Sequence, residues 1–204
     1  MWEQSKSARR RYFDGAFHAR YFVGSGIDIG GGPDQLGQYC GIFPLMQSVR
    51  TWDLPDGDAQ YMTGVADNSY DFVHSSHCLE HMRDPLMAMR SWLRILKPGG
   101  HCVVTIPDED MYELGHWPSR FNSDHKWTFT MFKRASWSPV SVNVLDLAIA
   151  LTDVAAIERI VRVSDFFRPA MAAAGQDQTM TPVAECAIEM VLQKSAPVAR
   201  QDQS

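Results

Sequence analysis

The chain has 204 residues, of which 45% are hydrophobic and 21% are charged, and its 19 basic and 24 acidic side chains give a net charge of −5 at pH 7. This balance is typical of a globular domain, so collagen-like, coiled-coil and disordered chains are excluded. A mildly acidic chain also lacks the positive surface of nucleic-acid binders, and the one basic cluster, 9–11, is too short to supply it. We therefore expect no nucleic-acid partner.

The cysteines and the apolar stretches indicate where the protein resides. The four cysteines form no CxxC pair, so we expect reduced thiols rather than a disulfide framework or a cysteine zinc site. The first residues are polar and form no apolar signal core. No stretch reaches the ~18 uncharged apolar residues of a membrane span, and the nearest approach, 144–157, contains Asp146 and Asp153. The sequence thus predicts a cytoplasmic protein without a membrane segment.

The first half of the chain alternates predicted strands with helices and turns. Apolar side chains at helical spacing predict a helix within 5–22, and a strand at 27–29 then enters the glycine-rich turn 30–34. Further strands are expected at 48–53, 70–74 and 102–106. The clearest helix begins after Asp84, which is a favourable N-cap residue, and ends in a Lys-Pro-Gly-Gly segment.

The second half contains an irregular segment and then further regular elements. Residues 107–139 are rich in aromatic residues, histidine and proline, and we interpret them as an insert on the substrate side. A helix is predicted at 141–151, strands within 155–163 and 183–192, and a flexible tail at 195–204. Strands alternating with helices indicate one domain over 1–194, with a mainly parallel sheet covered on both faces. In such sheets ligands bind beyond the carboxyl ends of the strands.

The glycine-rich turn admits three ligand classes, which differ in spacing. A phosphate-binding P-loop requires Lys and then Ser or Thr after its last glycine, whereas Gln and Tyr follow Gly37, so this class is excluded. The dinucleotide-binding fingerprint G-x-G-x-x-G requires three glycines, and the turn supplies two of them, Gly30 and Gly32. This disfavours a nicotinamide or flavin cofactor without excluding it. The third class places an acid two residues before the first glycine, as Asp28 stands here. Carboxylate and backbone donors at one turn suit the amino-acid end of a cofactor.

The turn and five later landmarks resemble class I S-adenosylmethionine-dependent methyltransferases. The turn itself, Asp28-Ile29-Gly30-Gly31-Gly32, is similar to the family's first motif, although Asp34 stands where a third glycine is usual. The later landmarks are Asp53, Asp58-Ala59-Gln60, the segment 67–73, Ser75-Ser76-His77-Cys78-Leu79-Glu80-His81, and Leu96-Lys97-Pro98-Gly99-Gly100. With the insert included, the chain resembles a type 11-like methyltransferase subgroup associated with bacterial surface-glycan biosynthesis.

This resemblance implies a Rossmann-like α/β sandwich with a mostly parallel sheet, an antiparallel final strand and S-adenosyl-L-methionine as cofactor. The cofactor-binding residues that it implies are Asp28, Gly30, Gly31, Gly32, Asp53, Leu54, Asp58, Ala59, Ser75, Ser76 and His77. Asp53 would accept the ribose hydroxyls, unless Asp56 replaces it, and the segment from Asp58 would meet the adenine. Only four residues separate Asp53 from Asp58, where the family has a helix and a strand, so we expect a domain compacted after its second strand.

The expected reaction is O-methylation of a small molecule, sugar or glycan precursor by a monomer or homodimer. A hydroxyl acceptor requires a base, and His125, His81 and Asp108 are the candidates. The polar and aromatic groups of the insert suit a substrate pocket and equally a loop that packs its own aromatics. We predict no metal site. The alternative is a site formed by His77, Glu80 and His81, because some relatives bind a divalent ion through a similar E-x-x-E-H cluster. The rival functions are a catalytically silent cofactor-binding partner subunit and a nicotinamide-dependent oxidoreductase.

Overall fold

A six-stranded sheet with strand order β2-β1-β3-β4-β8-β7 forms the centre of the computed structural model, which describes residues 3–196. The first four strands along the chain run parallel: β1 (Gly24–Ile29), β2 (Met46–Trp52), β3 (Tyr70–Ser76) and β4 (Leu96–Pro107). Of the last two, β8 (Ala187–Lys194) runs antiparallel to both of its neighbours, β4 and β7 (Ala155–Val163), so β7 runs in the same direction as the first four strands. This topology confirms the expected Rossmann-like sandwich with an antiparallel end. Of the tail expected at 195–204, residues 197–204 lie outside the described part of the chain.

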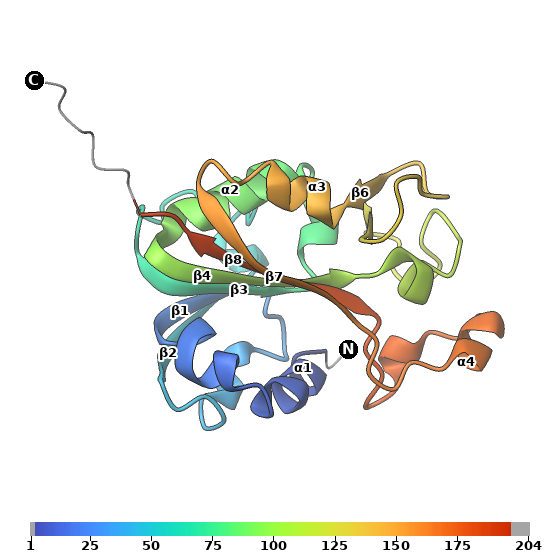
Figure 1. Ribbon diagram of the computed structural model, residues 1–204, viewed down its shortest axis with the longest axis horizontal. Coiled ribbons are helices and arrows are strands. Elements are labelled where there is room, and N and C mark those ends of the chain that lie inside the picture. The colour runs from blue at the N-terminus through green and yellow to red at the C-terminus, as the bar shows by residue number, and fades with distance from the viewer. Residues whose placement is uncertain (1–2, 197–204) are drawn as a thin grey trace, which may run out of the picture.

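Helical segments cover both faces of the sheet (Figure 1). On one face lie α2 (Pro85–Ile95), α3 (Val144–Ile149) and a separate two-stranded pair, β5 (Thr128–Thr130) with β6 (Ser141–Asn143). The other face carries α1 (Glu3–Tyr12), the π-helical η1 (Phe17–Tyr21) and the 3-10 segment η2 (Leu36–Tyr39). The remaining helical elements are η3 (Leu54–Asp56), η4 (Leu79–His81), η5 (Glu109–Glu113), α4 (Pro169–Ala173) and η6 (Gln178–Met180). Within residues 3–196, no helix combines the length and the apolar character that a membrane crossing requires.

The alternation of side chains along β4 gives the sheet two hydrophobic cores. Cys102, Val104 and Ile106 point into the core beneath α2, where Trp92 is fully buried. Val103 points the other way, into a smaller aromatic core formed largely by the segment that follows α1. Because both faces are covered, consecutive residues of β4, Cys102, Val103 and Val104, are all buried, as expected for a strand covered on both sides.

The expected compaction after the second strand is confirmed. Among the described residues, 57–69 form only turns, so β2 is the edge of the sheet. Side chains of α2 satisfy the backbone of this segment: Trp92 Nε1 donates to the Ala59 carbonyl at 2.9 Å, and Arg94 donates to the Val65 carbonyl at 2.8 Å. The helix itself begins as expected, because the Asp84 carboxylate accepts the N–H of Met87 at 3.0 Å.

Several predicted bounds differ from the structure. The leading helix expected within 5–22 is divided, because the Asp14 carboxylate accepts the N–H of Ala16 and starts a new turn. The helix expected at 141–151 is confined to α3, where Asn143 caps its first turn. The structure also contains α4 and η6, which the sequence analysis did not predict.

Two residues of the basic cluster at 9–11, Arg10 and Arg11, form ion pairs inside the molecule. Arg11 is 0% exposed, and its guanidinium donates to Glu189 at 2.7 Å and to the Thr105 hydroxyl at 3.0 Å. Arg10 bonds the carboxylates of Glu185 and Glu189. Burial alone would raise the pKa of Glu189, but Arg11 and Arg10 lower it to about 2. These ion pairs hold α1 against β8.

Candidate functional site

Two adjoining cavities open at the carboxyl ends of β1, β2 and β3. The first, of about 230 Å³, contains the glycine-rich turn and is called here the glycine-turn cavity. The second, of about 570 Å³, is called the Asp53 cavity. Gly30, His77 and His81 line both, so the two form one continuous site. The position agrees with the rule that ligands bind beyond the carboxyl ends of parallel strands.

The structure distributes the predicted site residues between these cavities. The glycine-turn cavity is lined by Asp28, Gly30, Gly31, Gly32, Ser76, His77, His81 and His125, and the Asp53 cavity by Asp53, Leu54, Asp58 and Ala59. Ser75 lines neither, because its hydroxyl donates to the Ile29 carbonyl inside the sheet at 3.0 Å. Asp108 also lines neither: its carboxylate accepts two backbone N–H groups and so caps η5. Burial raises the pKa of Asp108, but its position gives it no access to either cavity.

The glycine-rich turn depends on two positions that favour glycine. Gly30 and Gly32 have φ angles of +75° and +51°, which L side chains rarely adopt. A Cβ on Gly30 would also lie 2.7 Å from the Cys78 sulfur. At Gly32, by contrast, a Cβ would meet no atom within 4 Å, so the backbone there is open toward the cavity. The turn can therefore bring its N–H groups close to a ligand.

Asp28 holds this turn in place. Its carboxylate accepts the N–H of Leu36 at 2.7 Å, which fixes the start of η2, and its other oxygen lies 2.6 Å from Nδ1 of His74. Burial lowers the pKa of His74, so the ring is neutral and donates to Asp28. The other ring nitrogen lies 3.2 Å from Arg11, which links the turn to the ion pairs beneath α1. Asp28 thus acts largely as a positioning residue.

Asp53 ends β2 with part of its hydrogen-bonding capacity free. Its carboxylate accepts the N–H groups of Gly32 at 3.1 Å and Leu54 at 2.8 Å. The capping box of η3 adds the backbone of Asp56 as a donor. A carboxylate has about four acceptor positions, so it keeps acceptor capacity for a ligand in the Asp53 cavity. Asp56 is turned back to accept the N–H of Asp53 at 3.0 Å and is not among the lining residues. The geometry therefore favours Asp53 over Asp56 as the acceptor of a diol.

The far end of the Asp53 cavity can hold a flat apolar group. Trp52, Ala59 and Met82 contribute apolar walls. Asp58 accepts the N–H of Gln60 at 2.9 Å and a bond from Arg83 at 2.6 Å, which fixes the edge of the cavity. This combination is suited to an aromatic base with polar edges.

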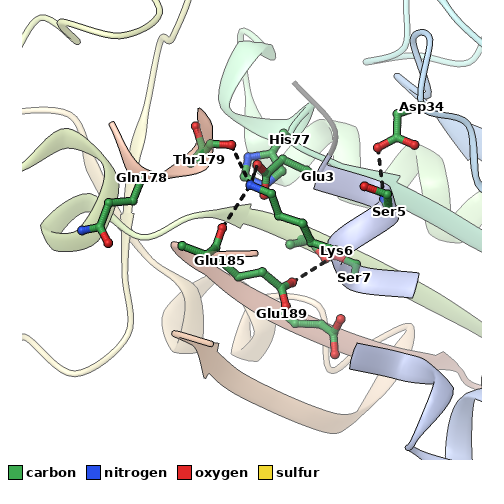
Figure 2. Close-up of polar contacts among 12 residues, drawn as sticks. Glu3, Ser5, Lys6, Ser7, Asp34, His77, Gln178, Thr179, Glu185 and Glu189 are labelled. Atoms are coloured by element: carbon green, nitrogen blue, oxygen red, sulfur yellow. Dashed lines mark hydrogen bonds and ion pairs between the residues drawn. The ribbon is translucent and has the colours of Figure 1, made fainter. Parts of the chain in front are cut away.

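The beginning of α1 forms a wall of the glycine-turn cavity that sequence reasoning missed. Figure 2 shows how it is held: the Ser5 N–H donates to Asp34 at 3.0 Å, and the buried Lys6 ammonium donates to Glu3 and to the Thr179 carbonyl. Glu3 and Gln4 consequently line the cavity. Polar residues at the start of a helix carry no signal of burial, so nothing in the sequence indicated this role. Asp34, which replaces the family's usual glycine, is a docking point for α1.

Buried polar atoms without hydrogen-bond partners gather around this cavity. Among the described residues such atoms belong to Gln4, Ser76, His77, Glu80, His101 and Glu113. Four of these residues, Gln4, Ser76, His77 and Glu80, line the glycine-turn cavity. Buried polar groups are nearly always satisfied in native proteins, so this concentration points to a polar ligand.

The insert brings His125 to the same place. The Lys126 N–H donates to the Glu80 carbonyl at 2.8 Å, which fixes the insert against η4. His125 Nδ1 lies 2.8 Å from Glu113, and its Nε2 lies 3.9 Å from the Glu80 carboxylate. The His81 and His125 rings are 5.0 Å apart, and His81 Nδ1 lies 2.9 Å from Asp124.

S-adenosylmethionine-dependent methyltransferases require a glycine-rich turn that is open to a ligand, next to a carboxylate that can accept the ribose hydroxyls. The chain is an enzyme of this class. More particularly, it belongs to the family described as a methyltransferase domain, whose model matches residues 7–138. No protein of curated function matches the chain significantly. S-adenosylmethionine is therefore the methyl donor, and the free acceptor positions of Asp53, the open backbone at Gly32 and the unsatisfied polar atoms fit it.

Solved structures share the fold at low sequence identity. A SAM-dependent methyltransferase from Archaeoglobus fulgidus has a TM-score of 0.58 at 15% identity, with 96% of this chain and 95% of that chain covered. A protein from Bacillus halodurans described as a methyltransferase has a TM-score of 0.59 at 12% identity, with 95% and 100% covered. A Haemonchus contortus phosphoethanolamine N-methyltransferase, solved with S-adenosylhomocysteine, has a TM-score of 0.59 at 15% identity, with 96% of this chain but only 53% of that chain covered.

Proposed function

We propose that the protein transfers the methyl group to a hydroxyl of a small, polar acceptor, such as a sugar or a phenol, bound in the glycine-turn cavity. The observation that carries this proposal is the His125–Glu113 pair. Glu113 holds Nδ1 of the ring at 2.8 Å, which leaves Nε2 free to accept a proton. A hydroxyl must lose its proton to become a good nucleophile, so a fixed imidazole in the acceptor cavity favours an oxygen acceptor.

The charge of the cavity narrows the acceptor class. Glu3, Asp28, Asp34 and Glu80 line it, and none of the described lining residues is Lys or Arg. A phosphate or carboxylate group on the acceptor would meet these carboxylates, and no described lysine or arginine among the lining residues would offset its charge. We therefore expect an uncharged or cationic acceptor, and saccharide hydroxyls are within this class.

The proposed division of the site follows the two cavities. Asp53 would accept the ribose hydroxyls, the walls around Ala59 would take the adenine, and the backbone of Gly30–Gly32 would hold the amino-acid end. Bound S-adenosylmethionine supplies a methyl carbon that its sulfonium activates toward nucleophiles. The chain's part is to align the acceptor, exclude water beneath α1 and the insert, and receive the hydroxyl proton at His125 Nε2. His81, the second predicted base, is half-buried and paired with the exposed Asp124, so we assign it a supporting position.

The test is methyl transfer from labelled S-adenosylmethionine to a panel of neutral sugars, phenols, amines and phosphorylated sugars. We expect transfer to a hydroxyl acceptor, with weak or no use of the phosphorylated set. His125→Asn should lower kcat about 10²- to 10⁴-fold while the Kd for S-adenosylhomocysteine stays unchanged.

A control and two outcomes separate this proposal from its rivals. His101→Asn is matched, because His101 is also buried but lies on β4 beside Tyr21, away from both cavities. Full activity of His125→Asn, or transfer confined to amines, would contradict the proposal. Cofactor binding without transfer to any acceptor would indicate a silent partner subunit, and binding of NADH in its place would indicate an oxidoreductase.

A further inference from the structure

We infer that Glu80, His81 and His125 form a binding site for a divalent transition-metal ion on the wall of the glycine-turn cavity. Each residue offers a ligand atom, and these atoms all lie within 4.8 Å of one another. Glu80 and His81 come from η4, whereas His125 comes from the insert that packs on it. Metal–ligand bonds of about 2.0–2.2 Å place ligand atoms about 3–4 Å apart, so small side-chain shifts would close the group around an ion.

Both imidazoles are held in the way that metal ligands require. His125 Nδ1 lies 2.8 Å from Glu113, and His81 Nδ1 lies 2.9 Å from Asp124. In each ring, Nε2 is then the nitrogen left to bind an ion. A ligating histidine almost always holds its other nitrogen on a carboxylate or carbonyl, which fixes the ring and makes it a better donor. Two histidines that independently show this arrangement and face one carboxylate are not explained by packing alone.

Glu80 supplies the independent observation that a ligand belongs there. Its side chain is 0% exposed, yet within the part of the chain that the structure describes neither carboxylate oxygen has a hydrogen-bond partner. The nearest ring nitrogens are His77 Nδ1 at 3.6 Å and His125 Nε2 at 3.9 Å, which is beyond a normal hydrogen bond. Burying a carboxylate without a hydrogen bond is costly, and a cation between Glu80 and the imidazoles of His81 and His125 would reduce that cost.

The donor set indicates the kind of ion. Two imidazoles and one carboxylate are ligands for Zn²⁺, Mn²⁺, Fe²⁺ and similar ions, whereas Mg²⁺ and Ca²⁺ prefer oxygen ligands throughout. Three protein ligands also leave coordination positions open toward the cavity. The ligand set differs from the alternative that the sequence suggested: His125 joins Glu80 and His81, and His77 does not belong to the group, since its Nε2 faces Glu3 at 3.8 Å.

Ion binding does not depend on the identity of the acceptor. Nε2 of His125 can hold either an ion or a proton, so the residue is a ligand in the ion-loaded protein and a base in the ion-free protein. The site is therefore tested by binding, without turnover. A failure of the metal site leaves the proposed O-methylation standing, and a failure of O-methylation leaves the metal site standing.

The experiment is calorimetric titration of the tag-free full chain, stripped with a chelator, with Zn²⁺, Mn²⁺ and Mg²⁺ in turn, and Mn²⁺ binding is checked by electron paramagnetic resonance. We expect one Zn²⁺ or Mn²⁺ per chain and far weaker binding of Mg²⁺. Glu80→Gln and His125→Asn should each lower the affinity at least 10-fold, and Glu113→Gln should lower it about 10- to 100-fold through the orientation of His125.

His101→Asn is the matched control and should bind as the parent does, while thermal melts verify that every variant is folded. Absence of stoichiometric binding to the parent protein would overturn the inference. So would unchanged affinity in folded Glu80→Gln and His125→Asn. Loss of binding in His77→Asn together with retention in His125→Asn would instead identify the ligand set suggested by the sequence, and would also overturn it.

Discussion

Replacing Asp53 with Ala tests most directly whether the Asp53 cavity holds the ribose of S-adenosylmethionine. Asp53 is the acid at the end of β2 that lines the Asp53 cavity, and its carboxylate accepts the N–H groups of Gly32 and Leu54 within the protein. The substitution removes the predicted bonds to the ribose hydroxyls. It also releases Gly32, so the glycine-rich turn loses one of its supports.

The expected size of the effect follows from charge-assisted hydrogen bonds. One or two such bonds contribute about 1–3 kcal/mol to binding, and about 1.4 kcal/mol corresponds to a tenfold change in affinity. The Kd for S-adenosylhomocysteine should therefore rise about 5- to 150-fold. The free energy of unfolding should fall by only about 1 kcal/mol, because the side chain is a half-buried cap of the short η3.

Calorimetry with S-adenosylhomocysteine measures the affinity, and a thermal melt measures the stability. Asp56→Ala is the matched control, since Asp56 stands three residues away in the same capping box but is not among the residues lining the cavity. It should bind within about 3-fold of the parent. Unchanged affinity in Asp53→Ala with a loss in Asp56→Ala would refute the reasoning and transfer the ribose contact to Asp56.

Three further predictions concern the framework of the site. The pKa of Glu189 is lowered to about 2 in the folded protein, against about 4.3 when unfolded, so its stabilisation of about 3 kcal/mol is present above pH 4.3 and is lost as the pH falls through 2. Urea unfolding at pH 6 and pH 3 should show roughly half of this loss in the parent and much less of it in Glu189→Gln. Arg11→Met should lower the free energy of unfolding by about 3–5 kcal/mol, because Glu189 is then buried with less compensation, and a shift below 1 kcal/mol would contradict that account. Gly30→Ala should both lower the melting temperature and weaken binding of S-adenosylhomocysteine, because a Cβ there would lie 2.7 Å from the Cys78 sulfur at a φ of +75°; parental affinity would show that the turn tolerates a side chain.

Local features of the chain were predictable because adjacent residues determine them. Asp84 caps α2 through a backbone group three residues ahead, and the glycines after β1 set a turn of unusual φ within a few residues. The missing helix and strand after β2 were equally visible, as a short interval between Asp53 and Asp58. The fold follows from such short-range patterns, and the same patterns predict the cofactor-binding residues. Ser75 and Asp108 show the limit of these patterns, because their side chains form hydrogen bonds of their own and line neither cavity.

The sequence by itself thus determined the class of the protein, the order of its elements and the turn that faces the cofactor. Only the tertiary structure decided that the start of α1 walls the cavity, that Arg11 is buried against Glu189, and that His125 meets Glu80. The physical reason is that each of these contacts joins segments far apart in the chain, whose separation leaves no periodicity or spacing to detect. The packing of the helices and the insert onto the sheet selects these partners. Of the described residues that this packing leaves with unsatisfied buried polar atoms, four line the glycine-turn cavity.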